Sequence, residues 1–156
     1  MATQQIDEKT SLIIALIRMA RVDGRVNHYE QMNISLLTNT LGVDHAEVTL
    51  LAKDIDNVPV VVPVTREDKV KYFWRILIMM KMDLQAHKAE LKLAQELGEA
   101  LELPENEVRG LIDYMVENVA KFIGLEKFEA RLIEIQKDPA YAPKKTFWQK
   151  IFPWMK

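Results

Sequence analysis

Two short acidic stretches carry carboxylates that could bind a metal ion. Asp23 and Glu30 stand seven positions apart in "VDGRVNHYE", and Asp83 and Glu90 stand seven positions apart in "MDLQAHKAE". Carboxylates are hard ligands, and a cation such as Ca²⁺ takes about 6–8 oxygen ligands. One stretch alone offers too few, so a divalent-cation site requires that the two stretches face each other and pool their four acids.

The same residues also suit a purely structural role at helix ends. Asp-Gly is a common turn pair, and Asn27 followed three residues later by Glu30 has the form of a capping box that starts a helix. The stretch does not match an EF-hand loop, because Arg25 and Ile34 stand where that loop needs ligands. We favour the capping interpretation and keep the cation site, with Ca²⁺ as one candidate ion, as the alternative.

No pattern in the chain is typical of an enzyme. Cysteine is absent, which excludes thiolate metal sites and cysteine nucleophiles. The three histidines do not have the spacing of zinc ligands, and neither a nucleophile elbow nor a Gly-rich phosphate loop is present. We therefore expect a protein without catalytic activity of its own.

Stepping the sequence along itself by 60 residues reveals an internal repeat. Positions 14–48 align with 74–108 without a gap, and Met19, Asp23 and Glu30 fall on Met79, Asp83 and Glu90. The matches follow apolar and turn positions, as one supersecondary unit used twice would show.

Each unit is predicted to contain three helices. The first helix, over 6–22, is apolar on nearly every side and is expected to be buried. Asn27 starts the second helix and Gly42 ends it, while Asp44 starts a third, short helix to about residue 54. In the second unit, Thr65 and His87 start the first two helices, and Pro104 is expected as the first residue of the third.

These elements predict an all-α fold, a single compact domain of about seven helices over residues 1–137. It comprises unit one (6–54), an extended crossover with two prolines (55–64), unit two (65–120) and one more amphipathic helix (125–137).

The repeated motif resembles the tellurite-resistance TerB-like family. The resemblance lies in Asp-Gly-x-Val-Asn-x-x-Glu after an apolar helix, in "LGVDHAEV", and in the second copy "MMKMDLQAHKAELKLAQELGEALELPENEV". It implies a helical domain associated with bacterial stress-response and tellurite-resistance systems, often beside membrane-linked components. It also implies that the motif acids, here Asp23, Glu30, Asp83 and Glu90, are candidate ligands of a divalent cation.

The second copy departs from this pattern at two positions. Leu84 stands in place of the turn glycine, and His87 stands where Ser, Asn or Asp usually caps the helix. A left-handed turn at Leu84 would cost about 1 kcal/mol or more relative to glycine. Whatever role the two acidic turns share, we expect the second turn, at Asp83, to perform it less well than the first.

The last segment, 138–156, is basic and aromatic and requires a surface to dock on. Residues 137–156 carry five lysines against Asp138, a charge of +4, so the rest of the chain sums to −6 for a net charge of −2. A helix of about two turns is too short to persist alone in water. The docking surface is the protein's own domain, an anionic membrane, or a partner protein or second copy in a homodimer. The expected contact residues of the segment are Lys144, Lys145, Phe147, Trp148, Ile151, Phe152 and Trp154.

Charge and hydropathy also bear on partners and location. An acidic body is a poor nucleic-acid binder, because phosphate contacts need a basic face. The first ten residues are polar and carry acids, and the longest apolar run, 12–17, is far short of the roughly 20 residues that span a bilayer. We expect a cytoplasmic protein that contacts a protein partner or lies at the inner face of the membrane.

Overall fold

The computed structural model describes residues 5–22, 24, 26–82, 87–142 and 154. Within them the chain forms seven α-helices and two short 3₁₀ helices, and no strand, which confirms the predicted all-α fold. The α-helices are α1 (Glu8–Arg21), α2 (His28–Leu41), α3 (His45–Leu51), α4 (Arg66–Met80), α5 (Lys88–Ala100), α6 (Glu105–Glu117) and α7 (Leu125–Lys137). The 3₁₀ helices are η1 (Ala52–Asn57) and η2 (Pro139–Tyr141).

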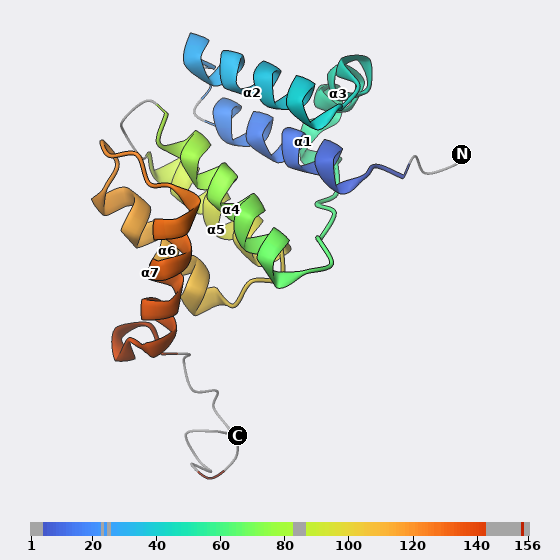
Figure 1. Ribbon diagram of the computed structural model, residues 1–156. Coiled ribbons are helices and arrows are strands. Elements are labelled where there is room, and N and C mark those ends of the chain that lie inside the picture. The colour runs from blue at the N-terminus through green and yellow to red at the C-terminus, as the bar shows by residue number, and fades with distance from the viewer. Residues whose placement is uncertain (1–4, 23, 25, 83–86, 143–153, 155–156) are drawn as a thin grey trace.

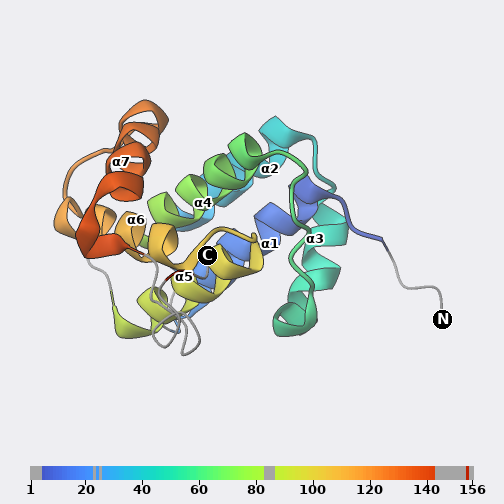
Figure 2. The same ribbon diagram turned by 90° about the horizontal axis from the view of Figure 1, so that it is seen from below.

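Helices α1 and α4 lie side by side at the centre of the bundle (Figure 1). On one side α2 and α3 pack on α1, and on the other α5 and α7 pack on α4, with α6 between α5 and α7. The view from below shows α6 and α7 at one end of the bundle and α3 at the other, and the crossover between η1 and α4 runs past the start of α1 (Figure 2).

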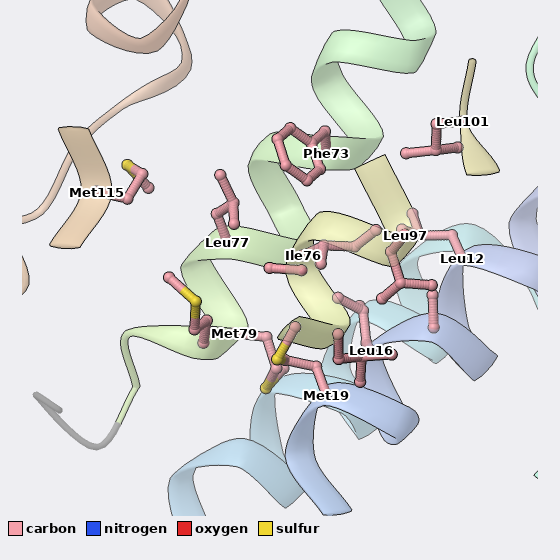
Figure 3. Packing of buried hydrophobic residues seen from close by; sticks show 14 of the residues in the cluster. Leu12, Leu16, Met19, Phe73, Ile76, Leu77, Met79, Leu97, Leu101 and Met115 are labelled. Atoms are coloured by element: carbon pink, nitrogen blue, oxygen red, sulfur yellow. The ribbon is translucent and has the colours of Figure 1, made fainter. Parts of the chain in front are cut away.

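The core explains why α1 carries so few polar residues. From Thr10 to Ala20 every side chain except Arg18 is buried, as the apolar sequence predicts. Leu12 and Leu16 of α1 point toward Ile76 and Leu97 on α4 and α5 (Figure 3). Burying such a side chain contributes about 1.5–3 kcal/mol, so the contact between α1, α4 and α5 stabilises the fold.

The predicted caps fix most helix ends. Asn27 and Glu30 form the expected capping box at the start of α2, and Gly42 ends that helix in the left-handed conformation, with φ 69°. The Thr65 hydroxyl accepts a hydrogen bond from the backbone N–H of Asp68, and Asp44 caps α3 through Ala46. Pro104 was predicted as the first helical residue, but it occupies the cap position with extended backbone (ψ 139°), and α6 begins one residue later.

The crossover is shorter than predicted. Residues 55–57 belong to η1, which follows α3 directly and is kinked at Asp54, so the extended stretch begins only at Val58. The residue before a proline is driven out of helical conformation, and Pro59 therefore excludes Val58 but not the residues before it.

The two units share a register without sharing all of their packing. The second and third helices of each unit begin at His28 and Lys88, and at His45 and Glu105, in both cases 60 residues apart. However, α3 has seven residues and packs on α1 and η1, whereas α6 has 13 and packs on α5 and α7. The recurring helix starts agree with a repeat, while the two third helices have different roles.

Candidate functional site

Glu30 is held in the capping box at the start of α2. Its backbone N–H donates to Asn27 Oδ1 at 2.8 Å, and its own Oε1 accepts from the Asn27 backbone N–H at 3.1 Å. The residue is only 8% exposed. The carboxylate thus satisfies backbone groups that a helix N-terminus leaves unpaired, which is the structural role predicted for it.

Glu90, sixty residues later, occupies the equivalent third position of α5 and is also buried. Its Oε1 lies 3.9 Å from His87 Nε2, an ion pair when the imidazole is protonated. The backbone of His87 has the extended conformation of a cap, but its side chain makes no capping hydrogen bond. The second turn thus differs from the first where the sequence departs from the motif.

Asp23 and Asp83, the other two predicted ligands, lie outside the described residues. Within the described part of the chain, no group of three or more His, Asp or Glu side chains is close enough to hold a metal ion. The pooling of four acids therefore remains a prediction.

One described residue near each acidic turn lines the same cleft. Val22, at the end of α1, and Ala89, in the first turn of α5, both line an open cleft of about 520 Å³ between α1, η1 and α5. The charged side chains of its lining are Arg18, Arg21, Lys92, Asp56 and Glu96.

The electrostatics of this cleft oppose the binding of a cation. Three basic side chains face two carboxylates, and Arg18 Nε lies 3.7 Å from the exposed Asp56 carboxylate. A second guanidinium, that of Arg21, donates to the Ala52 carbonyl at 3.3 Å. Positive charges near a site weaken the binding of a cation, so the lining of this cleft does not favour a cation site.

Sequence reasoning missed this cleft, although one signal was present. Arg18 is the only charged residue inside the apolar run of α1, and it is largely covered, with a side chain 19% exposed. Arg18 pairs with Asp56 of η1 and lines the cleft with Lys92 of α5, and a sequence pattern does not show that these elements meet.

The remaining candidate groups are separate from one another. His45 Nε2 is hydrogen-bonded to Asn39 Oδ1 at 2.6 Å, at the junction of α2 and α3. Lys81 is buried and donates from Nζ to the Lys121 carbonyl at 2.5 Å, and burial lowers the pKa of this amine. Both contacts join neighbouring segments of the fold.

The C-terminal segment starts from an anchored point. The Tyr141 hydroxyl donates to Asp113 Oδ2 at 2.8 Å, and the Arg109 guanidinium lies 5.5 Å from the Tyr141 ring centroid. The hydrogen bond to Asp113 raises the pKa of Tyr141. Beyond Ala142 only Trp154 is described, with 76% of its surface exposed. The other predicted contacts, Lys144, Lys145, Phe147, Trp148, Ile151 and Phe152, lie outside the described residues.

Comparison of the chain with protein-family models, curated proteins and solved structures gives no match. Within the described residues, every helix is too short or too polar to cross a membrane.

Proposed function

We propose that this chain is a non-enzymatic, TerB-like interaction module of a bacterial stress-response assembly, and that its basic aromatic segment makes the contact. The module would act in the cytoplasm, with a protein partner or the inner face of the membrane as its target. The repeated motif and the helix starts 60 residues apart support the relation to TerB-like proteins.

The observation that carries the proposal is the anchor at Tyr141. Its contacts with Asp113 and Arg109 attach η2 to α6, so the described chain up to Ala142 has a defined place on the domain. The segment from residue 143 contains four of the five lysines between 137 and 156, together with Phe147, Trp148, Phe152 and Trp154. Aromatic residues beside lysines favour both protein hot spots and anionic lipid surfaces, where each nearby lysine contributes about 1 kcal/mol.

The test compares the full chain with a variant ending at Ala142, in pull-downs from a bacterial lysate and in flotation with vesicles containing anionic lipid. We expect the truncation to abolish capture. A matched control is Phe122→Ala, which removes an aromatic side chain that is 77% exposed but lies on the domain itself. Equal capture by the full and truncated chains would refute the role of the segment.

A divalent-cation sensor is the second candidate, favoured by the burial of both Glu30 and Glu90 next to the two acidic turns. A ligand that binds only the folded state raises the melting temperature. The Asp23→Ala, Asp83→Ala variant should then lose a rise in melting temperature that Ca²⁺ or Mn²⁺ gives the wild type, while Glu126→Ala, on the exposed face of α7, keeps it. Absence of any rise in the wild type would exclude this function.

A further inference from the structure

Helix α2 has apolar residues on two faces. Ile34, Leu37 and Leu41 form the inner stripe that packs on the core. Tyr29, Met32 and Leu36, spaced by three and four residues, form a second stripe that faces away from it. These three side chains, the outer stripe, are 70%, 56% and 69% exposed.

The exposed surface of α2 also carries no formal charge. Glu30 is the one charged residue among the helix's 14, and it is buried. The other exposed side chains are uncharged and polar: His28, Gln31, Ser35, Asn39 and Thr40. In a chain with 28% charged residues, an outer helix is expected to carry several charges on its solvent face. This face therefore lacks the charges that normally keep a surface helix solvated.

The described residues of the domain do not cover the outer stripe. Helix α2 packs on α1 and lies on the side of α1 that faces away from α4, at the edge of the bundle (Figure 1). The side chains of the outer stripe are therefore available to a second molecule along the length of the helix.

We propose that the outer stripe is the contact between two copies of this chain, with the two α2 helices packed antiparallel about a two-fold axis between Met32 and Leu36. In a two-fold interface the same patch meets itself, so any charge would lie near its own copy. A neutral stripe avoids that repulsion. In the antiparallel arrangement the N-terminus of each helix lies near the C-terminus of the other, so the two helix dipoles attract each other.

The residue order along α2 fits this arrangement. With the axis between Met32 and Leu36, Met32 of one copy lies beside Leu36 of the other, which places the longest apolar side chains at the centre. Tyr29 then lies beside Asn39 of the second copy, so that polar groups meet at each rim. An apolar centre with a polar rim is the usual composition of a protein interface.

An anionic membrane or a charged partner fits less well. The face offers no lysine or arginine to lipid headgroups. A charged partner surface would lose its hydration against Met32 and Leu36 without gaining a countercharge. A second copy of the chain presents the same uncharged, apolar face, so its surface matches the outer stripe.

The size of the stripe predicts a weak dimer. A 14-residue helix is about 21 Å long. Contact along one such face is well below the roughly 800 Å² per partner of a standard stable interface. The dimer should therefore form and dissociate reversibly with concentration. This inference does not rest on the role proposed for the C-terminal segment.

The first test is sedimentation of the full chain over a wide concentration range. We expect a monomer–dimer equilibrium that Leu36→Glu weakens at least tenfold, because the new carboxylate lies against the apolar centre of the second copy. The matched control is Ile133→Glu, at a 54% exposed apolar residue on α7, which should dimerise like wild type. Circular dichroism checks that both variants stay helical. A wild type that is monomeric throughout, or a dimer that survives Leu36→Glu, would overturn the proposal.

The absence of cysteine allows a direct test of orientation. Tyr29→Cys and Asn39→Cys should form a disulfide with each other when the two variants are mixed and oxidised. Neither should cross-link efficiently with itself, because each position lies about 15 Å along the helix axis from its own copy, and disulfides need Cα atoms within about 7 Å. Self-cross-linking of Tyr29→Cys would instead refute the antiparallel geometry.

Discussion

Gly42 and Glu102, sixty residues apart, adopt the same left-handed backbone conformation, with φ of 69° and 62°. Each follows the second helix of its unit. In both places the next N–H donates back into the helix, from Val43 to the Thr38 carbonyl at 3.0 Å and from Leu103 to the Gly98 carbonyl at 3.3 Å. This helix-ending geometry is kept in both units, although only the first has the glycine that adopts it without strain.

The first prediction is that Glu102→Gly stabilises the protein by about 0.5–1 kcal/mol. A left-handed conformation costs a non-glycine residue about 1–2 kcal/mol, and the added freedom of glycine in the unfolded chain offsets part of the gain. The carboxylate of Glu102 lies 3.4 Å from Lys69 Nζ, but the Glu102 side chain is 67% exposed, so the pair contributes little. Glu102→Ala serves as the control, since it removes the same ion pair and keeps the strain. Urea unfolding should rank Glu102→Gly above both wild type and Glu102→Ala, and the opposite order would contradict this account.

The second prediction concerns Gly98, where α5 approaches α4 and α6 closely. A Cβ atom there would lie 2.7 Å from Val108 Cγ1 and 2.9 Å from Phe73 Cε1, closer than real Cβ contacts. Gly98→Ala should therefore destabilise the protein by about 1–3 kcal/mol from overpacking, although alanine favours helix by about 1 kcal/mol. The check is a double-mutant cycle by urea unfolding. Adding Val108→Ala frees the space, so the double variant should lose less stability than the sum of the two single variants.

Local patterns in the sequence were sufficient to predict most helix boundaries, because caps act through neighbours within four residues. Asn27, Thr65 and Gly42 all behave as their types and positions predict. Aligning position 102 with Gly42 indicates a left-handed residue there as well. The strained backbone of Glu102 itself depends on a contact between distant elements, because this turn places Leu103 in the core.

Features that depend on contacts between distant elements could not be predicted in this way. The close approach at Gly98 involves Val108 and Phe73 from two other helices. The open cleft between α1, η1 and α5 likewise brings together Arg18 of α1 and Lys92 of α5. Periodicity also fails for α2, because apolar residues on both faces do not indicate which face is buried.

The third prediction concerns the buried Glu107, which joins three helices. Its Oε1 pairs with Arg66 at the start of α4 and accepts from Gln136 Nε2 of α7 at 2.8 Å. Glu107→Ala removes both contacts and should cost about 1–3 kcal/mol. The matched control is Glu47→Ala, sixty residues earlier in the first turn of α3, where a cost of less than about 0.5 kcal/mol is expected. Equal losses for the two variants in urea unfolding would show that the three-helix contact does not stabilise the fold.

The fourth prediction is an acid dependence that originates at Asp7. Its carboxylate caps α1 by accepting from the Thr10 backbone N–H at 2.8 Å, and this hydrogen bond lowers the pKa of Asp7 below its ordinary value of 3.8. The unfolded chain therefore binds a proton at this carboxyl more readily than the folded chain does. The stability that the ionised cap contributes is present above pH 3.8 and is lost as the pH falls through the lower, folded pKa.

Asp7→Asn tests this dependence, because asparagine caps helices about as well as aspartate but does not titrate. Near neutral pH the variant and wild type should have similar free energies of unfolding. Below pH 3.8 the wild type should lose more stability than the variant, by a fraction of the roughly 1 kcal/mol that a cap contributes, because Asp7 is exposed to solvent. Thermal unfolding at a series of pH values measures the difference between the two proteins. Parallel curves would mean that the cap at Asp7 does not couple proton binding to folding.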